Sequence, residues 1–208
     1  MITRLVASKE RSPKVKVYLD GTYAFSVEAA VALEAKLRLN QELNQSGIET
    51  LERENRAKKA LAAAHNILSF RPRSEKELHQ KLSQKGYDAQ TISGCITRLK
   101  ESGLVNDVAF ARYWAENRAS FSPRSGRMVN LELRQKGVPA EMAEATCEAV
   151  DDESAAYAAG YKKASRLGTG DYEEFRRKVG ECLRRRGFAY DVIDRSLKKL
   201  WDETAHKE

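Results

Sequence analysis

The chain has 208 residues, of which 41% are hydrophobic and 8% aromatic, and its 37 Lys and Arg residues outweigh 30 Asp and Glu residues to give a formal net charge of +7. This length accommodates one or two domains, and the basic balance favours polyanionic or acidic partners. Because no apolar run approaches the roughly 18 residues that a membrane span needs, and Met1 is not followed by the apolar core of a signal sequence, we expect a cytoplasmic protein.

The first 45 residues differ in pattern from the rest of the chain, and part of them alternates apolar and polar side chains, which predicts a small β-sheet. The alternation from Val15 to Val27 centres on Asp20-Gly21, a dipeptide that favours the two-residue turn of a hairpin. The segment from Ile2 to Ala7 predicts a third strand, which is needed because an isolated hairpin is only marginally stable in water. A short helix over Glu28 to Arg38 would cover one face of this sheet.

A polar-rich run from Glu49 to Lys59 continues into an alanine-rich run from Ala60 to Leu68, without proline or internal glycine. Because neither of these helix breakers interrupts the segment, we predict one long helix from about residue 46 to residue 69. This helix would be a stiff connection between the sheet and the rest of the chain.

The remainder of the chain repeats one pattern three times. Leu82, Leu133 and Leu183 stand fifty-one and then fifty residues apart, and a glycine follows each of them four residues later. Other apolar residues keep the same register, and these are Leu78, Val129, Val179, Ile96, Cys147, Leu197, Leu99, Val150 and Leu200. A fixed period near fifty residues is typical of stacked arrays in which each unit buries an apolar face against its neighbour. We therefore expect these positions to be buried and the array to offer an extended binding surface.

Start and stop signals divide each repeat into three helices. In the first repeat Ser74 and Glu77 form a capping box, Gly86 ends the second helix in the left-handed conformation, and Asp88 begins the third helix. In the third repeat Asp171 supplies the cap earlier in the repeat, so its second helix should be about one turn longer.

These signals together predict a mainly α protein. Tandem three-helix repeats would form an elongated, curved array, preceded by a small N-terminal β-hairpin or three-stranded sheet with a helix. The predicted division places the sheet and its helix in residues 1–45, the helical linker in 46–59, and the three repeats in 60–105, 106–152 and 153–208.

Signals of catalytic chemistry are missing from the sequence. There is no glycine-rich loop followed by Lys-Ser or Lys-Thr, and no Gly-x-Ser-x-Gly. The histidines at positions 65, 79 and 206 lack metal-ligand spacing. Cys95, Cys147 and Cys182 include no Cys-x-x-Cys pair, which favours reduced thiols buried in the repeats. We predict that the protein is not an enzyme and that it binds no cofactor and no metal.

Basic residues recur at equivalent turns and crowd the third repeat. The members of this basic stripe are Arg71, Arg73, Lys76, Arg118, Arg124, Arg127, Lys162, Lys163, Arg166, Arg184, Arg185 and Arg186. Cations in series can contact phosphates or carboxylates, so we predict the stripe as the partner-binding surface. Alternatively, Arg184 to Arg186 only complement the dipole at a helix end, before Gly187. Tyr113, Trp114 and Trp201 are expected to pack inside the repeats rather than to stack on nucleobases.

The first repeat carries a longer signature. It reads Arg73-Ser74-x-x-Glu77-Leu78-x-x-Lys81-Leu82-x-x-Lys85-Gly86 and continues with Gly103-Leu104-Val105-Asn106-Asp107-x-x-Phe110-Ala111-x-Tyr113. This string resembles the RecX family of proteins that modulate the RecA recombinase, and the resemblance extends from about Lys14 to Trp201. It implies a non-enzymatic protein that docks in the groove of the RecA filament on single-stranded DNA. Filament growth, ATP hydrolysis, strand exchange and repressor self-cleavage would then be lowered.

The partner implied by this resemblance is the RecA filament, with contact to single-stranded DNA or its phosphates, and we expect a monomer. Two other functions remain open. Three-helix units with a short glycine turn are similar to helix-turn-helix DNA-binding domains, but the third helices begin with neutral or acidic residues, as in Asp88-Ala89-Gln90, which disfavours reading of a DNA groove. A plain scaffold is the other possibility.

Overall fold

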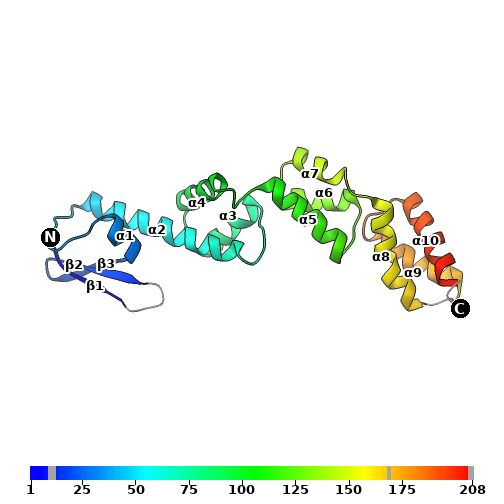
Figure 1. Ribbon diagram of the computed structural model, residues 1–208, viewed down its shortest axis with the longest axis horizontal. Coiled ribbons are helices and arrows are strands. Elements are labelled where there is room, and N and C mark those ends of the chain that lie inside the picture. Colours follow the sequence, from blue (N-terminus) through cyan, green and yellow to red (C-terminus); the bar gives the residue numbers. More distant parts are fainter. Residues whose placement is uncertain (9–12, 168–169, 206–208) are drawn as a thin grey trace. The chain divides into compact units, whose positions relative to one another are not determined.

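A computed structural model describes residues 1–8, 13–167 and 170–205, which form three strands and ten helices (Figure 1). Two compact units are present. The first comprises Met1–Arg71 and Leu78–Leu104, and the second comprises Pro72–Glu77 and Val105–Glu208. Three consecutive three-helix repeats behind a small N-terminal sheet confirm the mainly α fold class that the sequence predicts.

The N-terminal sheet is antiparallel, with the strand order β1 (Ile2–Ala7), β2 (Lys14–Leu19) and β3 (Thr22–Glu28). Asp20 and Gly21 join β2 to β3 with φ angles of 47° and 87°, the positive values that a two-residue hairpin turn requires, so the predicted hairpin is confirmed. Helix α1 (Ala29–Glu34) is shorter than the predicted span because Lys36 takes a left-handed conformation, with a φ angle of 49°, just after its end.

Helix α2 (Gln45–Leu68) runs unbroken for 24 residues, as predicted. Asn44 caps its N-terminus, because the Asn44 side chain accepts a hydrogen bond from the Gly47 amide. Its first half packs against the sheet, where Leu51 joins the buried core of Ile2, Val17, Phe25, Val27 and Val31. The buried Asn55 amide accepts a hydrogen bond from Glu28 N and donates one to the Ser26 carbonyl oxygen. Helix and sheet are therefore joined by polar as well as apolar contacts.

The first repeat combines the second half of α2 with α3 (Glu75–Gln84) and α4 (Ala89–Glu101). Ser74 Oγ accepts a hydrogen bond from Glu77 N, which confirms the serine half of the predicted capping box, and Asp88 Oδ1 accepts one from Thr91 N, which confirms the predicted cap of α4. Gly86 lies between the two helices with a φ angle of +85°. The apolar side chains that the repeat register predicts are buried, and they are Leu78, Leu82, Ile96 and Leu99.

The second unit holds the other two repeats. The second repeat consists of α5 (Asp107–Phe121), α6 (Gly126–Gln135) and α7 (Ala140–Cys147), and the third of α8 (Asp152–Leu167), α9 (Tyr172–Arg184) and α10 (Tyr190–Ala205). Asp171 caps α9 by accepting hydrogen bonds from the amides of Glu173 and Glu174. Helix α9 has 13 residues against 10 in each of α3 and α6, as the early cap predicts.

Each repeat of the second unit has its own apolar core. Val129 and Leu133 pack with Phe110 in the second repeat, and Val179 and Leu183 pack with Phe175 in the third. Trp114 and Trp201 pack as expected: the Trp114 ring stacks 6.0 Å from Phe110, and the Trp201 ring lies 5.0 Å from Phe175. The repeat register therefore identifies the centre of both cores.

Two positions of the register depart from the expected burial, because Cys147 and Val150 are only half-buried. Helix α7 has 8 residues and ends at Cys147, whereas α4 has 13. The carboxylate of Asp151 accepts hydrogen bonds from the amides of Glu153 and Ser154 and so begins the next helix. This early cap stops α7 before Val150 can join a helical face.

Candidate functional site

Two arginines of the predicted basic stripe meet on one carboxylate in the second repeat. Glu132 Oε2 accepts a hydrogen bond from Arg118 Nε at 2.7 Å, and Glu132 Oε1 lies 3.0 Å from a terminal nitrogen of Arg124. The Trp114 indole also donates to Glu132 Oε2, at 2.8 Å. Because the Glu132 side chain is only 13% exposed, these charges stabilise the repeat itself.

Glu77 has a similar role. It lies at the start of α3, in the short segment Pro72–Glu77 that belongs to the second unit. Its Oε1 accepts a hydrogen bond from Lys136 Nζ at 2.7 Å, and its Oε2 lies 3.9 Å from a terminal nitrogen of Arg73. Lys136 Nζ lies 4.0 Å from the centroid of the Trp114 ring, and the Arg118 guanidinium lies 4.5 Å from it. A single charged network around Trp114 thus contains three arginines of the predicted stripe.

In the first and second repeats, the turn before the second helix is joined to the glycine turn of the following repeat through equivalent residues but different hydrogen bonds. Ser74 Oγ donates to the Lys136 carbonyl oxygen at 2.6 Å, and Lys76 Nζ donates to the Gln135 carbonyl oxygen at 3.1 Å. One repeat later, Ser125 N donates to the Arg186 carbonyl oxygen at 3.1 Å, and Arg186 donates to the Pro123 carbonyl oxygen at 3.1 Å. Lys76 and Arg186 therefore take part in these two joints.

The remaining stripe residues are more accessible. Arg71 is half-buried in the first unit, whereas in the second unit the exposed members are Arg127, Lys162, Lys163, Arg166, Arg184 and Arg185. Lys162, Lys163 and Arg166 lie on α8, and Arg184 lies in the last turn of α9. The stripe consequently divides into cations that pair with groups inside the fold and cations that face solvent, and as a binding surface it stays a prediction.

Three arginines outside the stripe line a hollow of about 400 Å³ in the first unit. Arg53 and Arg56 come from α2 and Arg98 from α4. Across residues 1–8, 13–167 and 170–205, none of the three forms an ion pair within 4.0 Å. The sequence does indicate part of this basic surface, because Arg53 and Arg56 are close enough in sequence to share a helix face. We expected this segment to be only a linker.

The electrostatics of this hollow keep it cationic. The Thr91 amide and hydroxyl donate hydrogen bonds to Asp88, and together with the Arg56 guanidinium they hold the pKa of Asp88 below its usual value. The single carboxylate on the lining is thus committed to capping α4. Burial raises the pKa of the Cys95 thiol, so this side chain adds no negative charge.

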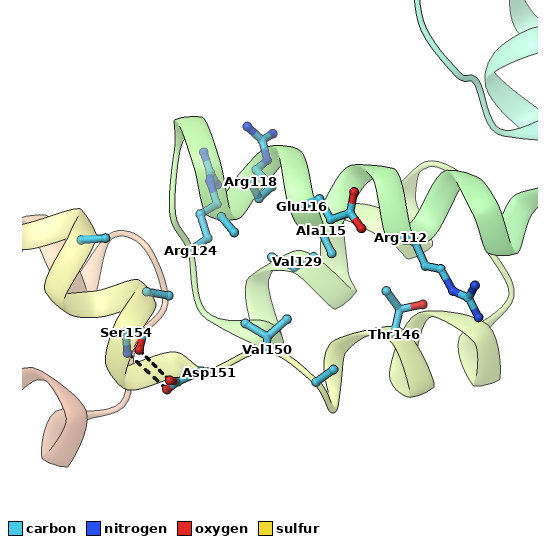
Figure 2. A pocket seen from close by; sticks show the side chains of 14 residues that line it. Arg112, Ala115, Glu116, Arg118, Arg124, Val129, Thr146, Val150, Asp151 and Ser154 are labelled. Carbon is cyan, nitrogen blue, oxygen red and sulfur yellow. Dashed lines mark hydrogen bonds between the residues drawn. The ribbon is translucent and has the colours of Figure 1, made fainter.

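A second hollow, of about 520 Å³, lies beside α5 where α7 ends (Figure 2). Figure 2 shows Arg118 and Arg124 together at one end, Arg112 and Thr146 at the other, and Val150 on the wall between. Most of the remaining lining is alanine, at positions 115, 119, 149, 155 and 158. The early end of α7 therefore leaves a mainly apolar surface bordered by cations.

Neither a metal site nor a membrane-spanning helix is present in the described part of the chain. There, no three His, Cys, Asp or Glu side chains come together in a group that could hold a metal ion. No helix among the same residues has both the length and the apolar character to cross a membrane.

Replacement of Glu132 by Gln is expected to lower the free energy of unfolding of the second unit by about 1 to 3 kcal/mol, because two half-buried guanidinium groups lose their carboxylate. A urea titration followed by circular dichroism measures this loss. The exposed Glu144 of α7 provides a matched control, and Glu144→Gln should change stability by less than about 0.5 kcal/mol. Equal midpoints for the two variants would mean that solvent replaces the network at no cost.

Comparisons with known proteins cover all three repeats. Residues 60–99, 106–146 and 151–197 match family models described as the first, second and third three-helix domains of RecX. The regulatory protein RecX of Amycolatopsis mediterranei is 35% identical over 158 residues, which cover 73% of this chain and 90% of that protein. The protein of the same name from Bacillus velezensis is 30% identical over 204 residues, covering 95% and 76% of the two chains.

Solved structures give a fold comparison. A crystal structure of a regulatory protein RecX superposes with a TM-score of 0.70 at 22% identity, covering 95% of this chain and 98% of that one. A crystal structure of RecX from Lactobacillus salivarius has a TM-score of 0.59 at 27% identity and covers 71% of this chain and 97% of that one. The three-helix repeats described above are thus similar to those of experimentally determined folds.

Proposed function

This chain belongs to the RecX family of regulatory proteins, and from that membership we propose that it binds the RecA filament on single-stranded DNA and restrains it. Filament assembly, ATP hydrolysis and the recombination and repair reactions that depend on the filament would be lowered. The match of all three repeats in succession, from residue 60 to residue 197, is the observation that carries this proposal.

The architecture of the second unit supports a partner that is itself repetitive. Its two joints use equivalent residues, Ser74 with Lys136 and Ser125 with Arg186, so successive repeats present equivalent turns. A polymer of identical subunits offers the same surface again and again, and a repeat protein can engage several of these surfaces at once. The repeats would hold neighbouring subunits together and hinder the addition of further ones.

Accessible cations support contact with acidic protein surfaces and DNA phosphates. The stripe contributes exposed Arg127, Arg184 and Arg185 in the second unit. The first unit contributes the hollow with Arg53, Arg56 and Arg98. Because these cations form no ion pair within 4.0 Å among the residues that the structure describes, direct binding of single-stranded DNA is the second candidate function. Binding to a labelled oligonucleotide without RecA, and its loss with added salt, separates the two candidates.

We expect the purified protein to slow the ATP hydrolysis that RecA performs on single-stranded DNA, at fewer protein molecules than RecA subunits, because one bound molecule blocks filament growth beyond it. Combined reversal of Arg127, Arg184 and Arg185 to Glu should weaken this inhibition at least about tenfold, since charge-assisted contacts are each worth roughly 1.5 to 3 kcal/mol. A coupled assay of ADP release at several concentrations provides the measurement.

The matched control reverses Arg4, Lys16 and Arg38, three exposed cations of the N-terminal region, and so makes the same change in net charge. This control should inhibit like the parent protein. A full titration of the parent without effect on RecA would contradict the proposed function. Equal weakening by both triple variants would instead assign the effect to net charge rather than to the stripe.

A further inference from the structure

The turns that end the first helices of repeats one and two share a six-residue motif. Residues 69–74 read Ser-Phe-Arg-Pro-Arg-Ser and residues 120–125 read Ser-Phe-Ser-Pro-Arg-Ser, identical at all but one position. The next helix has diverged in contrast, since the exposed His79 and Gln80 correspond to the half-buried Asn130 and the exposed Leu131. The motif has therefore kept residues that its surroundings have not.

The fold accounts for the second half of this motif. Ser74 and Ser125 are 0% and 1% exposed and form the joints to the following repeats. Arg73 and Arg124 pair with Glu77 and Glu132, and the Nε atom of each arginine is buried. Loss of any of these side chains would leave a buried polar group without its partner.

The fold does not account for the phenylalanine. Phe70 is 78% exposed and Phe121 is 77% exposed, more than any other aromatic side chain among residues 1–8, 13–167 and 170–203. Scattered exposed apolar residues are ordinary, but here the same large ring stands at the same position of two repeats. Neither ring belongs to a buried core cluster of its repeat.

Each ring lies at the end of the first helix of its repeat. Phe121 is the last residue of α5, and Phe70 follows α2 by two residues. Downstream, the proline of the motif restricts the chain and the buried serine ties it to the next repeat. Because a phenylalanine side chain has few rotatable bonds, an exposed ring can enter a partner's pocket with little loss of conformational entropy, as binding hot spots do.

We propose that Phe70 and Phe121 are anchors that insert into equivalent apolar pockets on subunits of the RecA filament. This inference rests on the proposed function and assigns a contact to it. A protein pocket is favoured over stacked nucleobases because stacking sites also need free cations for phosphates, whereas the shared arginine of each motif is already paired with a carboxylate. The duplicated anchor matches a partner whose pocket recurs from subunit to subunit.

The test compares Phe70→Ala, Phe121→Ala and the double variant with the parent. Fluorescently labelled protein is titrated against RecA filaments assembled on single-stranded DNA, and in parallel against the same DNA alone. Leu33→Ala is the matched control, because Leu33 is 79% exposed but lies on α1, outside the repeats. Thermal melts confirm folding, which exposed substitutions of this kind should leave unchanged.

Each single phenylalanine variant should bind filaments about tenfold more weakly, the loss typical of a hot-spot side chain, and the double variant should lose roughly the product of the two. Leu33→Ala should bind like the parent, and no variant should change binding to DNA alone. Three results would each contradict the proposed role of the two rings as anchors. These are filament binding by the double variant as tight as that of the parent, a loss of filament affinity no larger than that of Leu33→Ala, and a loss of affinity seen only for DNA alone. Absence of filament binding by the parent would instead remove the proposed function.

Discussion

Leu133→Asp is expected to unfold the second repeat, with a loss of about 3 to 5 kcal/mol in the free energy of unfolding. Leu133 is 0% exposed and packs among Phe110, Val129 and Val138, so a carboxylate at this position would be buried without a partner. Leu82→Asp and Leu183→Asp should act in the same way on the first and third repeats, because both leucines are equally buried.

Thermal melts followed by circular dichroism at 222 nm, a wavelength sensitive to helix content, measure this effect. The control is Leu131→Asp, two residues earlier on α6, where the side chain is 48% exposed. This variant should stay within about 0.5 kcal/mol of the parent. If Leu133→Asp and Leu131→Asp melted together, the fifty-residue period would not mark the core.

Gly187→Ala is expected to destabilise the joint between the second and third repeats by about 2 to 5 kcal/mol. Gly187 has a φ angle of +84°, which costs any other residue about 1 to 2 kcal/mol. A Cβ at this position would also overlap the Met128 side chain and lie 2.8 Å from Ser125 Oγ, and such overpacking costs a further 1 to 3 kcal/mol, roughly. Gly137→Ala should behave alike, since its Cβ would lie 2.5 Å from Lys76 Cβ.

Gly86→Ala isolates the backbone contribution, because Gly86 has a φ angle of +85° but no atom within 4 Å of an added Cβ. Urea titrations of the three variants should therefore place Gly86→Ala closest to the parent, at a loss of about 1 to 2 kcal/mol. Equal losses of stability at all three glycines would show that the neighbouring side chains move aside at no energetic cost, so that only the φ angle of the glycine matters.

Local signals explain why much of the fold could be predicted from sequence. Ser74, Asp88 and Asp171 cap the helices that they were expected to cap, because a cap needs only its own side chain and the next few amides. The sheet and the long helix α2 follow from alternation and from the lack of helix breakers in the same way. The repeat register adds the core, since equivalent leucines must face equivalent neighbours.

The binding surface is harder to predict because it depends on distant pairs. No spacing rule connects Arg118 and Arg124 to Glu132, so the basic stripe could not be separated in advance into internally paired and exposed cations. The end of α7 is set by a competition between continuing this helix and starting the next one at the Asp151 cap. The two alternatives differ little in free energy, so the sequence does not decide between them. Phe70 and Phe121 share the repeat period with the buried leucines, so the period alone does not tell an exposed ring from a core residue.

The buried amide of Asn55 constrains how this chain can evolve. A descendant that lost the sheet would expose Ile48 and Leu51 to water and would leave Asn55 without the two backbone groups of Ser26 and Glu28 that satisfy it. Loss of the N-terminal strands therefore requires compensating polar replacements along α2 in the same lineage. The sheet and the first half of this helix thus form one structural module, whichever partner the repeats bind.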